Sequence, residues 1–470
     1  MSHIFISAAH KSSGKTTISI GLSAAINNMG YQVQTFKKGP DYIDPMWLSR
    51  ASGRNCYNLD FYTMRESEIV QTFNQHMSGA DIGIIEGNKG LYDGLDLDGS
   101  NSNAALATLL DAPVILVMDS RGMTRGIAPL VLGYQNFDDN INIQGVILNQ
   151  VGGSRHEEKL RAILEHYTDV TVLGAVHKNS VLNIDERHLG LIPSNEEYLA
   201  DKRIQLIADN IKAQVNLEEI ITLGKKSGIT PGKDTSSISS GINKQATSPV
   251  RIGIFQDEAF GFYYPDDLEA LQQSGAELIT INSLTDQNLP EVDGLFIGGG
   301  FPETQMQPLY NNASLRNSVK VAIENGLPAY AECGGMMYLA RSITWNNTRF
   351  DMVGVIQGDI IMHSRPQGRG YIKLQETEHH PWASTVNNSV VFAHEFHYSE
   401  LVNLDHQYTY AYKVLRGTGI DGENDGLSYR NLLANYAHLR NTQDNQWAFR
   451  FVRFTRQVKD SIVNSRTITQ

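Results

Sequence analysis

The stretch AHKSSGKTT, residues 9–17, decides the fold of the first half of the chain. It follows the apolar run HIFISAA, residues 3–9, and leads into the helical pattern of residues 16–30. Its spacing is that of a phosphate-binding loop, except that Ala9 occupies the position of the leading glycine. A strand, such a loop and a helix in succession direct backbone N–H groups at phosphate oxygens. The sequence therefore predicts a nucleotide site on an α/β sheet.

The side chains of this loop indicate ATP with Mg²⁺ as the ligand. Lys15 can reach the outer phosphates, and the hydroxyl of Thr16 can ligate Mg²⁺. Asn149 ends the apolar run GVILNQ, where its amide either reads the adenine edge or stabilises a turn. The residues predicted to bind ATP are Lys11, Ser12, Ser13, Gly14, Lys15, Thr16, Thr17 and Asn149.

Acidic side chains follow two later apolar runs. Asp41 and Asp44 lie in GPDYIDP, just past the second run, and Glu86 ends the run IGIIEG. Mg²⁺ prefers oxygen ligands, and ligands of parallel sheets collect at the carboxyl ends of the strands. We therefore predict Thr16, Asp41 and Glu86 as metal ligands, the alternative for each acid being a solvated loop position.

Composition limits the classes of protein and of partner. Of the 470 residues, 41% are hydrophobic and 19% are charged, which is ordinary for a folded enzyme. A net charge of −12 argues against nucleic-acid binding, because neutralising phosphates needs a basic face. Two cysteines, Cys56 and Cys333, are too few for a disulfide framework, which favours a reducing cytoplasm. We find no signal-peptide pattern and no apolar run of about 18 residues, so we expect no membrane partner.

The chain divides into two α/β halves. Residues 224–249 are rich in Gly, Ser, Thr and Lys and predict a flexible linker between domains 1–223 and 250–470. In both halves short apolar runs alternate with amphipathic stretches, the pattern of mostly parallel sheets flanked by helices. The predicted strands are HIFISAA, QVQTFKKG, IGIIEG, APVILVMD, QGVILNQ and TVLGAV in the first half, and RIGIFQD, ELITINS, GLFIGGG and PAYAEC in the second.

Cys333 is the candidate nucleophile of the second half. In PAYAECGGMMYL it stands between a short apolar run and a helical one, followed by two glycines that permit a sharp turn. A cysteine at such an elbow is assisted by the helix N-terminus and needs a histidine as base. The backbone N–H groups of Gly299, Gly300 and Gly334 are the predicted oxyanion hole. The alternative is a buried, inert cysteine.

Three late histidines, His394, His397 and His438, are candidates for the base. His438, in LLANYAHLR near the C-terminus, is the first choice because triad partners commonly follow the nucleophile in the chain. The segment FAHEFHYSE, which carries the other two, is interpreted as part of a substrate or interdomain surface.

The motifs GKTT, KKGPDYIDP, NLD, EGNKGLYDG, GGGFPE, AECGGMMYL and EFHYS resemble those of the cobyrinic acid a,c-diamide synthase family across nearly the whole chain. This family joins a dethiobiotin-synthetase-like ATPase domain of the P-loop type to a class I glutamine amidotransferase domain. The resemblance implies a ligase of cobalamin biosynthesis: Cys333 attacks the glutamine amide, His438 is the base, and ammonia displaces phosphate from an acyl phosphate. An acidic tetrapyrrole is then the acceptor. Family positions for acceptor binding correspond to Tyr42, Ile43, Asp44, Tyr92 and Asp93.

The sequence departs from the family at three places. Ala9 opens the phosphate loop, Asn88 and Lys89 replace small apolar residues, and Arg440 stands where many amidotransferases place a triad Glu. Arg440 thus indicates a Cys–His dyad. Lys89 is either a solvent-facing loop residue or a cation for a different carboxylate pattern, since members of this family also amidate sirohaem or nickel-sirohydrochlorin. Cobyrinic acid ranks first and those tetrapyrroles second.

Readings from other classes explain less of the chain. A non-catalytic P-loop nucleotide switch would not need the Cys333 elbow. A dethiobiotin synthetase would leave the second half unexplained, and a serine hydrolase lacks its G-x-S-x-G elbow at a strand end. Whether the protein forms a homodimer is left open.

Overall fold

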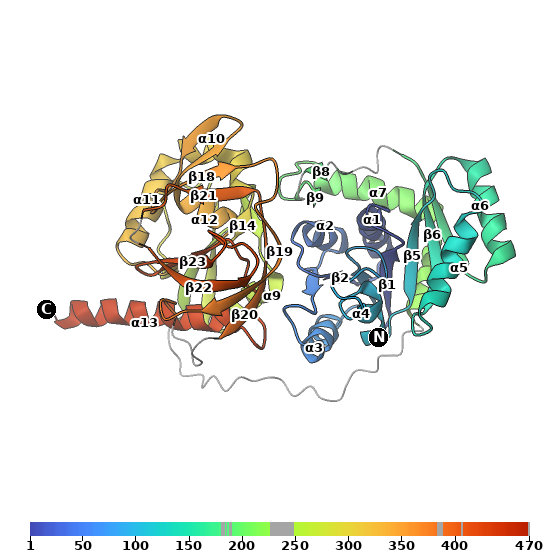
Figure 1. Ribbon diagram of the computed structural model, residues 1–470, viewed down its shortest axis with the longest axis horizontal. Coiled ribbons are helices and arrows are strands. Elements are labelled where there is room, and N and C mark those ends of the chain that lie inside the picture. Colours follow the sequence, from blue (N-terminus) through green and yellow to red (C-terminus); the bar gives the residue numbers. More distant parts are fainter. Residues whose placement is uncertain are drawn as a thin grey trace. The chain divides into compact units, whose positions relative to one another are not determined.

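The computed structural model describes residues 1–179, 184, 186–187, 190–225, 249–382, 389–405 and 408–468. It consists of two compact units, Met1–Ser239 and Ser240–Gln470 (Figure 1). Helix α8 (Leu217–Gly224) is the last element of the first unit, and strand β10 (Val250–Phe255) is the first of the second. Residues 226–248 of the predicted linker lie outside the described residues.

The first unit is built on a parallel sheet of seven strands among the residues described. Their order is β3-β2-β4-β1-β5-β6-β7. The strands are β1 (His3–Ala8), β2 (Val33–Lys38), β3 (Tyr57–Leu59), β4 (Ile82–Glu86), β5 (Val114–Asp119), β6 (Ile143–Val151) and β7 (Thr171–His177); β8 (Glu186–Arg187) and β9 (Gly190–Leu191) form a small separate hairpin. Because a parallel sheet needs both faces covered, its strands read as nearly continuous apolar runs.

Helices cover both faces of this sheet. The helices of the unit, besides α8, are α1 (Lys15–Asn28), α2 (Ile43–Ser52), α3 (Glu66–His76), α4 (Asn103–Leu109), α5 (Ile127–Phe137), α6 (Ser154–Tyr167) and α7 (Ala200–Gln214). One apolar core joins Phe36 and Leu116 of the sheet to Phe73 of α3, Val131 of α5 and Leu160 of α6. Helices α1, α2 and α7 pack on one another on the other side.

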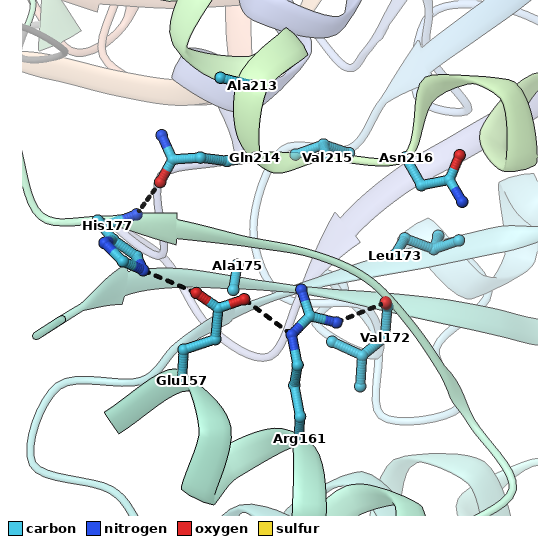
Figure 2. A pocket seen from close by; sticks show the side chains of 10 residues that line it. All are labelled: Glu157, Arg161, Val172, Leu173, Ala175, His177, Ala213, Gln214, Val215 and Asn216. Atoms are coloured by element: carbon cyan, nitrogen blue, oxygen red, sulfur yellow. Dashed lines mark hydrogen bonds and ion pairs between the residues drawn. The ribbon is translucent and has the colours of Figure 1, made fainter. Parts of the chain in front are cut away.

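Strand β7 forms one edge of the sheet, and the segment after α7 caps it. The N–H of Asn216 donates to the carbonyl of Leu173 at 2.8 Å, and Gln214 Oε1 accepts from the N–H of His177 at 2.8 Å. Figure 2 shows the open pocket beside this edge, in which Glu157 of α6 contacts both His177 and Arg161. None of the predicted site residues lines this pocket, so we assign it no catalytic role. The segment that caps β7 protects the edge of the sheet from pairing with another chain.

The second unit contains a mixed sheet of nine strands among its described residues. The order is β12-β10-β13-β15-β24-β23-β22-β19-β20, parallel up to β24 and antiparallel beyond it. These strands, besides β10, are β12 (Ala276–Ile281), β13 (Gly294–Ile297), β15 (Ala329–Glu332), β19 (Gly368–Glu376), β20 (Val390–His397), β22 (Thr409–Arg416), β23 (Asn424–Tyr429) and β24 (Leu432–Asn435). Two smaller sheets contain β11 (Phe260–Phe262) with β14 (Gly299–Gly300), and β16 (Ala340–Trp345), β17 (Thr348–Asp351), β18 (Ile356–Met362) and β21 (Ser399–Val402).

Helices of the second unit flank the parallel half of the sheet. They are α9 (Pro265–Gln273), η2 (Pro302–Gln305), α10 (Met306–Asn311), α11 (Ala313–Glu324), α12 (Gly334–Leu339) and α13 (Trp447–Ile468). Two apolar cores form, one including Ile297, Val319 and Met336, the other including Ile252, Tyr330 and Trp447. In the described part of the chain we find no helix long and apolar enough to cross a membrane.

The α/β fold class is confirmed in both units, and each of the ten predicted strands overlaps an observed one. Strands β3, β8, β9 and β11, and the strands from β16 onward, were not among those predicted. The second sheet is consequently mixed rather than mostly parallel.

Candidate active sites

The phosphate loop of the first unit follows β1 directly. Gly14 has a left-handed φ of 88° and precedes α1, so the backbone turns sharply into the helix. Asn149, at the end of β6, donates its amide to the carbonyl of Ser13 at 2.8 Å. A Cβ at Gly14 would clash with this amide. Asn149 therefore supports the loop; a contact with adenine stays a prediction.

A cluster of oxygen atoms lies beside the loop. The hydroxyl of Thr16 donates to Glu86 Oε1 at 2.8 Å and to Asp44 Oδ2 at 3.1 Å. These residues meet because β2 pairs with β4, which places Lys37 opposite Glu86 and brings the start of α2 to the same edge. The sheet topology thus unites Thr16, Asp44 and Glu86, although the sequence assigned Asp44 to the acceptor.

Lys37 lies in the middle of this cluster. Its Nζ is 2.5 Å from Asp44 Oδ2 and 2.6 Å from Glu86 Oε1, and Asp41 Oδ2 is 3.8 Å away. Burial alone would lower the pKa of Lys37, but Asp44 and Glu86 outweigh it and raise that pKa well above its usual value. The sequence analysis did not predict a role for Lys37. The signal that could have found it is the pair of lysines, Lys37 and Lys38, in strand β2, all of whose residues are buried.

The cluster fits Mg²⁺ bound together with a nucleotide. In the described part of the chain no group of three Asp, Glu, His or Cys side chains could hold a metal ion. Thr16, Asp44 and Glu86 nevertheless present hard oxygen donors, and Glu86 Oε2 is buried without a hydrogen-bond partner. Mg²⁺ is typically bound by one or two carboxylates, with phosphates and water completing its shell. Asp41 uses its Oδ1 to accept from the N–H groups of Ile43 and Asp44.

Burial shifts the pKa values of the ionisable groups at this edge. Desolvation, with Lys37 nearby, lowers the pKa of Lys15 to about 8. Desolvation and the charge of Asp44 raise the pKa of Asp41 to about 7. Desolvation also lowers the pKa of Lys38 to about 8; its Nζ contacts Asn101 Oδ1 at 3.3 Å. The site thus contains cations that an anionic ligand would stabilise.

The residues predicted to contact the acceptor have different surroundings. Asp93 accepts from the N–H of Gly90 at 2.9 Å and lies near Lys15. Tyr92 donates to the carbonyl of Tyr134 at 2.6 Å and stacks on its ring, which gives it a packing role. Tyr42 and Ile43, at the start of α2, are buried, whereas Lys89 is exposed. Nothing in these contacts identifies the acceptor.

In the second unit Cys333 forms a strained elbow. It has a positive φ of 46°, between β15 and the six-residue helix α12. Its N–H donates to the carbonyl of Asn435 at 2.7 Å, which holds it against the end of β24. Non-glycine residues with positive φ are uncommon, and such strain collects at functional sites.

The predicted glycines and base lie around this elbow. A Cβ at Gly299 would be 2.5 Å from Cε1 of His438, and one at Gly334 would be 2.9 Å from the backbone nitrogen of Gly300. His438 follows β24, the strand paired with β15, so neighbouring strand ends bring it and Cys333 to one edge. The structure therefore gathers Cys333, His438 and the three predicted glycines.

Burial raises the pKa of the Cys333 thiol, and Glu303 adds to that effect. The N–H of Gly334 acts in the opposite direction but is weaker. The assistance expected from the helix N-terminus is thus outweighed, as a helix of two turns supplies little dipole. A thiol whose pKa is raised in this way needs a base to become nucleophilic.

The other two candidate histidines hold different positions. His394 stacks on His438 with ring centroids 4.9 Å apart, and burial first, then His438, lowers the pKa of His394 well below its usual value. His397 stacks on Tyr436 at 3.8 Å and makes a 2.8 Å hydrogen bond with the carbonyl of Ser399. Of the three histidines, His438 is the one that lies beside Gly299, a predicted member of the oxyanion hole.

Comparisons with known proteins cover both units. Residues 4–192 match the family model described as the CobQ/CobB/MinD/ParA nucleotide binding domain. Residues 251–446 match the model of the CobB/CobQ-like glutamine amidotransferase domain. The cobyrinate a,c-diamide synthase of Magnetococcus marinus is 43% identical over 97% of this chain and 97% of its own. Those of Methanosarcina acetivorans and Archaeoglobus fulgidus are each 39% identical, over 93% and 96% of this chain and 92% and 96% of their own lengths.

A nucleotide-binding unit and a glutamine amidotransferase unit in one chain define an ATP- and glutamine-dependent ligase that forms amides. Identity of this degree over both units makes the family certain. The chain belongs to the cobyrinate a,c-diamide synthase family.

Proposed function

We propose that this protein converts the a and c carboxylates of cobyrinic acid into carboxamides, using ATP and the amide nitrogen of glutamine. The observation that carries the proposal is the full-length similarity to cobyrinate a,c-diamide synthases, 43% identity over 97% of the chain in one case. Sirohaem or a metal-sirohydrochlorin is the alternative acceptor.

In the first unit the chain positions ATP and the acceptor for phosphoryl transfer. A carboxylate is a poor electrophile until one of its oxygens becomes a leaving group. The acceptor carboxylate attacks the terminal phosphorus of ATP, its C–O⁻ becomes an acyl phosphate, and ADP leaves. Backbone N–H groups of residues 12–16 and the ammonium of Lys15 stabilise the charge on the transferred group. Mg²⁺, held by Thr16, Glu86 and either Asp44 or Asp41, neutralises phosphate charge when bound.

In the second unit the chain releases ammonia from glutamine. His438 takes the proton of Cys333, and the sulfur attacks the carboxamide carbon. The N–H groups near Gly299, Gly300 and Gly334 stabilise the resulting oxyanion. His438 returns the proton to the leaving nitrogen, ammonia departs, and water hydrolyses the thioester to glutamate. Ammonia then attacks the acyl phosphate, expelling phosphate and leaving the amide.

Mass spectrometry of the acceptor with Mg–ATP and glutamine labelled at the amide nitrogen tests the proposal. Cobyrinic acid should gain two labelled amides with the wild-type protein and none with the Lys15→Ala variant. Amidation of sirohaem but not of cobyrinic acid would identify sirohaem as the acceptor. Nucleotide binding without any amide product would overturn the proposal and favour a nucleotide switch.

Several finer predictions belong to the same proposal. We also propose domain limits of 1–223 and 250–470, which are supported by the end of α8 at Gly224 and the start of β10 at Val250. A cytoplasmic location is proposed from the cysteine content alone, because the two cysteines of the sequence, Cys56 and Cys333, are too few for a disulfide framework. A homodimer remains a prediction for measurement in solution.

A further inference from the structure

Glu332, the residue immediately before the nucleophile, is not used by the mechanism above. It ends β15, opposite Asn435 of β24, and its side chain is only 2% exposed. A buried carboxylate in the interior of a sheet is costly unless donors or a cation compensate it. The groups that contact Glu332 therefore indicate what it does.

The two carboxylate oxygens of Glu332 have separate partners. Oε1 accepts from the N–H of Leu439 at 2.8 Å and from the hydroxyl of Tyr330. Oε2 lies 3.5 Å from Nδ1 of His438. Since Oε1 is held by the backbone next to His438 and by Tyr330, two residues earlier in β15, Oε2 is fixed at the imidazole.

Arg440, at the position where many amidotransferases carry a triad acid, faces elsewhere. Its Nη2 donates to Asp266 at 2.8 Å, and its guanidinium lies 4.8 Å from the ring centre of Tyr264. A guanidinium has no acceptor for an imidazole N–H. The acid of a triad would have to come from another part of the fold.

We infer that Glu332 is the residue that positions His438, so that the glutaminase site is a Cys333–His438–Glu332 triad whose acid precedes the nucleophile. A carboxylate at Nδ1 holds the proton there and leaves Nε2 to act as the base. It also stabilises the imidazolium that forms when Cys333 loses its proton. The 3.5 Å between Oε2 and Nδ1 is an ion-pair distance, longer than a hydrogen bond, and contacts of catalytic groups are often long in the resting enzyme and shorten in the reacting complex. The triad replaces the dyad that Arg440 indicated.

The surroundings of the pair support this role. His394 stacks against His438 on one ring face, and mutual backbone hydrogen bonds of 2.8 and 3.4 Å tie the two residues together. Burial lowers the pKa of His394 well below its usual value, so it adds no charge beside the base at neutral pH. The titratable groups that interact electrostatically with His438 or Glu332 are Tyr263, Asp267, Tyr330, Cys333, His394 and Tyr412.

The test is Glu332→Gln in the full chain, which keeps the shape of the side chain and removes its charge. This inference rests on the proposed glutaminase chemistry, which can be followed as glutamate release without any acceptor. We expect kcat for glutamine hydrolysis to fall about 10- to 100-fold, the range for losing one hydrogen bond to a charged group. KM for glutamine should change little, and amidation supported by ammonium salts should stay at the wild-type rate.

The pH profile separates positioning from a merely structural role. Without the carboxylate the imidazolium is less stable, so the acidic limb of kcat/KM should move to lower pH. The matched control is Glu376→Gln, a glutamate that is 4% exposed in the same unit and accepts from the guanidinium of Arg450. It should leave both the rate and the pH profile unchanged.

A wild-type rate of glutamine hydrolysis by Glu332→Gln would overturn the inference. An equal loss of ammonium-dependent amidation in this variant would also overturn it. Should that variant not fold, Glu332→Asp keeps the charge and withdraws it from His438. It should lose glutamine hydrolysis and keep ammonium use, and an unchanged glutaminase rate would again overturn the triad. Glutamine hydrolysis by Cys333→Ala would instead count against the proposed function itself.

Discussion

Replacing Lys37 with Met tests how the first unit is held together. Lys37 is 2% exposed, and its ammonium lies within 2.6 Å of both Asp44 and Glu86. The substitution keeps most of the side-chain volume but leaves these two carboxylates without the cation between them. Removing one partner of a buried ion pair usually costs more than the pair contributes, because the remaining charge stays desolvated.

The expected cost is about 3–5 kcal/mol of unfolding free energy, the range for one buried partner left unpaired. For a domain of this size about 1 kcal/mol corresponds to 2–4 °C, so the midpoint should fall by about 6–20 °C. Mg²⁺ should recover part of this loss, since it would supply the missing positive charge among the same oxygens.

Differential scanning calorimetry of the full chain measures this effect. The transition of the first unit is the one that ATP shifts, since a ligand stabilises the unit it binds. The matched control is Lys38→Met, one residue further along β2 and equally buried, at 2% exposed. Among the residues that the structure describes, Lys38 makes no ion pair with a carboxylate like those of Lys37, and desolvation lowers its pKa to about 8. A Lys37→Met variant with a wild-type midpoint, or one no less stable than Lys38→Met, would refute the reasoning.

Three other predictions follow from the same contacts. Lys38→Met should stabilise the first unit at pH 7 by up to about 3 kcal/mol, because a lysine whose pKa falls from 10.5 to about 8 on folding destabilises the folded state while it is charged. The difference in unfolding free energy between variant and wild type should shrink as the pH rises from about 8 to 10.5. Cys333→Ala should lose glutamine-dependent amidation more than about 1,000-fold and keep ammonium-dependent amidation, whereas Lys15→Ala should stop both amidations and spare glutamate release; the two assays on each variant decide this. Gly300→Ala should disable glutamine hydrolysis alone, because a Cβ there would clash with the carbonyl of Ala259, and normal glutamate release would contradict that expectation.

Much of the fold could be predicted because the central strands are buried on both faces. Strands such as β4 and β5 read as unbroken apolar runs that end in acidic residues. The antiparallel strands of the second unit were harder to find. Strand β22, for example, mixes exposed and buried residues and has no apolar run that separates it from a loop.

The motifs located the nucleophile and the phosphate loop but not the groups that hold them. Thr16 and Cys333 belong to short patterns set by local backbone geometry. Lys37 and Glu332 act across strands, on partners 49 residues away in one case and 106 residues away in the other. Such a partner depends on which strands are neighbours and in what register, and a single sequence does not give that register.

Lys37 and Glu332 nevertheless share a property that the sequence displays. Each is a charged residue inside a strand whose other positions are buried, Lys37 in VQTFKK and Glu332 in AYAE. Charge in the interior of a sheet is costly, so a buried ionisable group either has its pKa shifted toward the neutral form, as Lys38 does, or has an opposite charge or donors nearby, as Lys37 and Glu332 do. In both units that partner belongs to the reacting machinery, Asp44 and Glu86 beside the phosphate loop and His438 beside Cys333. A buried charge at the carboxyl end of a strand is therefore a signal of how the neighbouring catalytic residues are positioned, and the Glu332 and Lys37 variants test this signal independently in the two units.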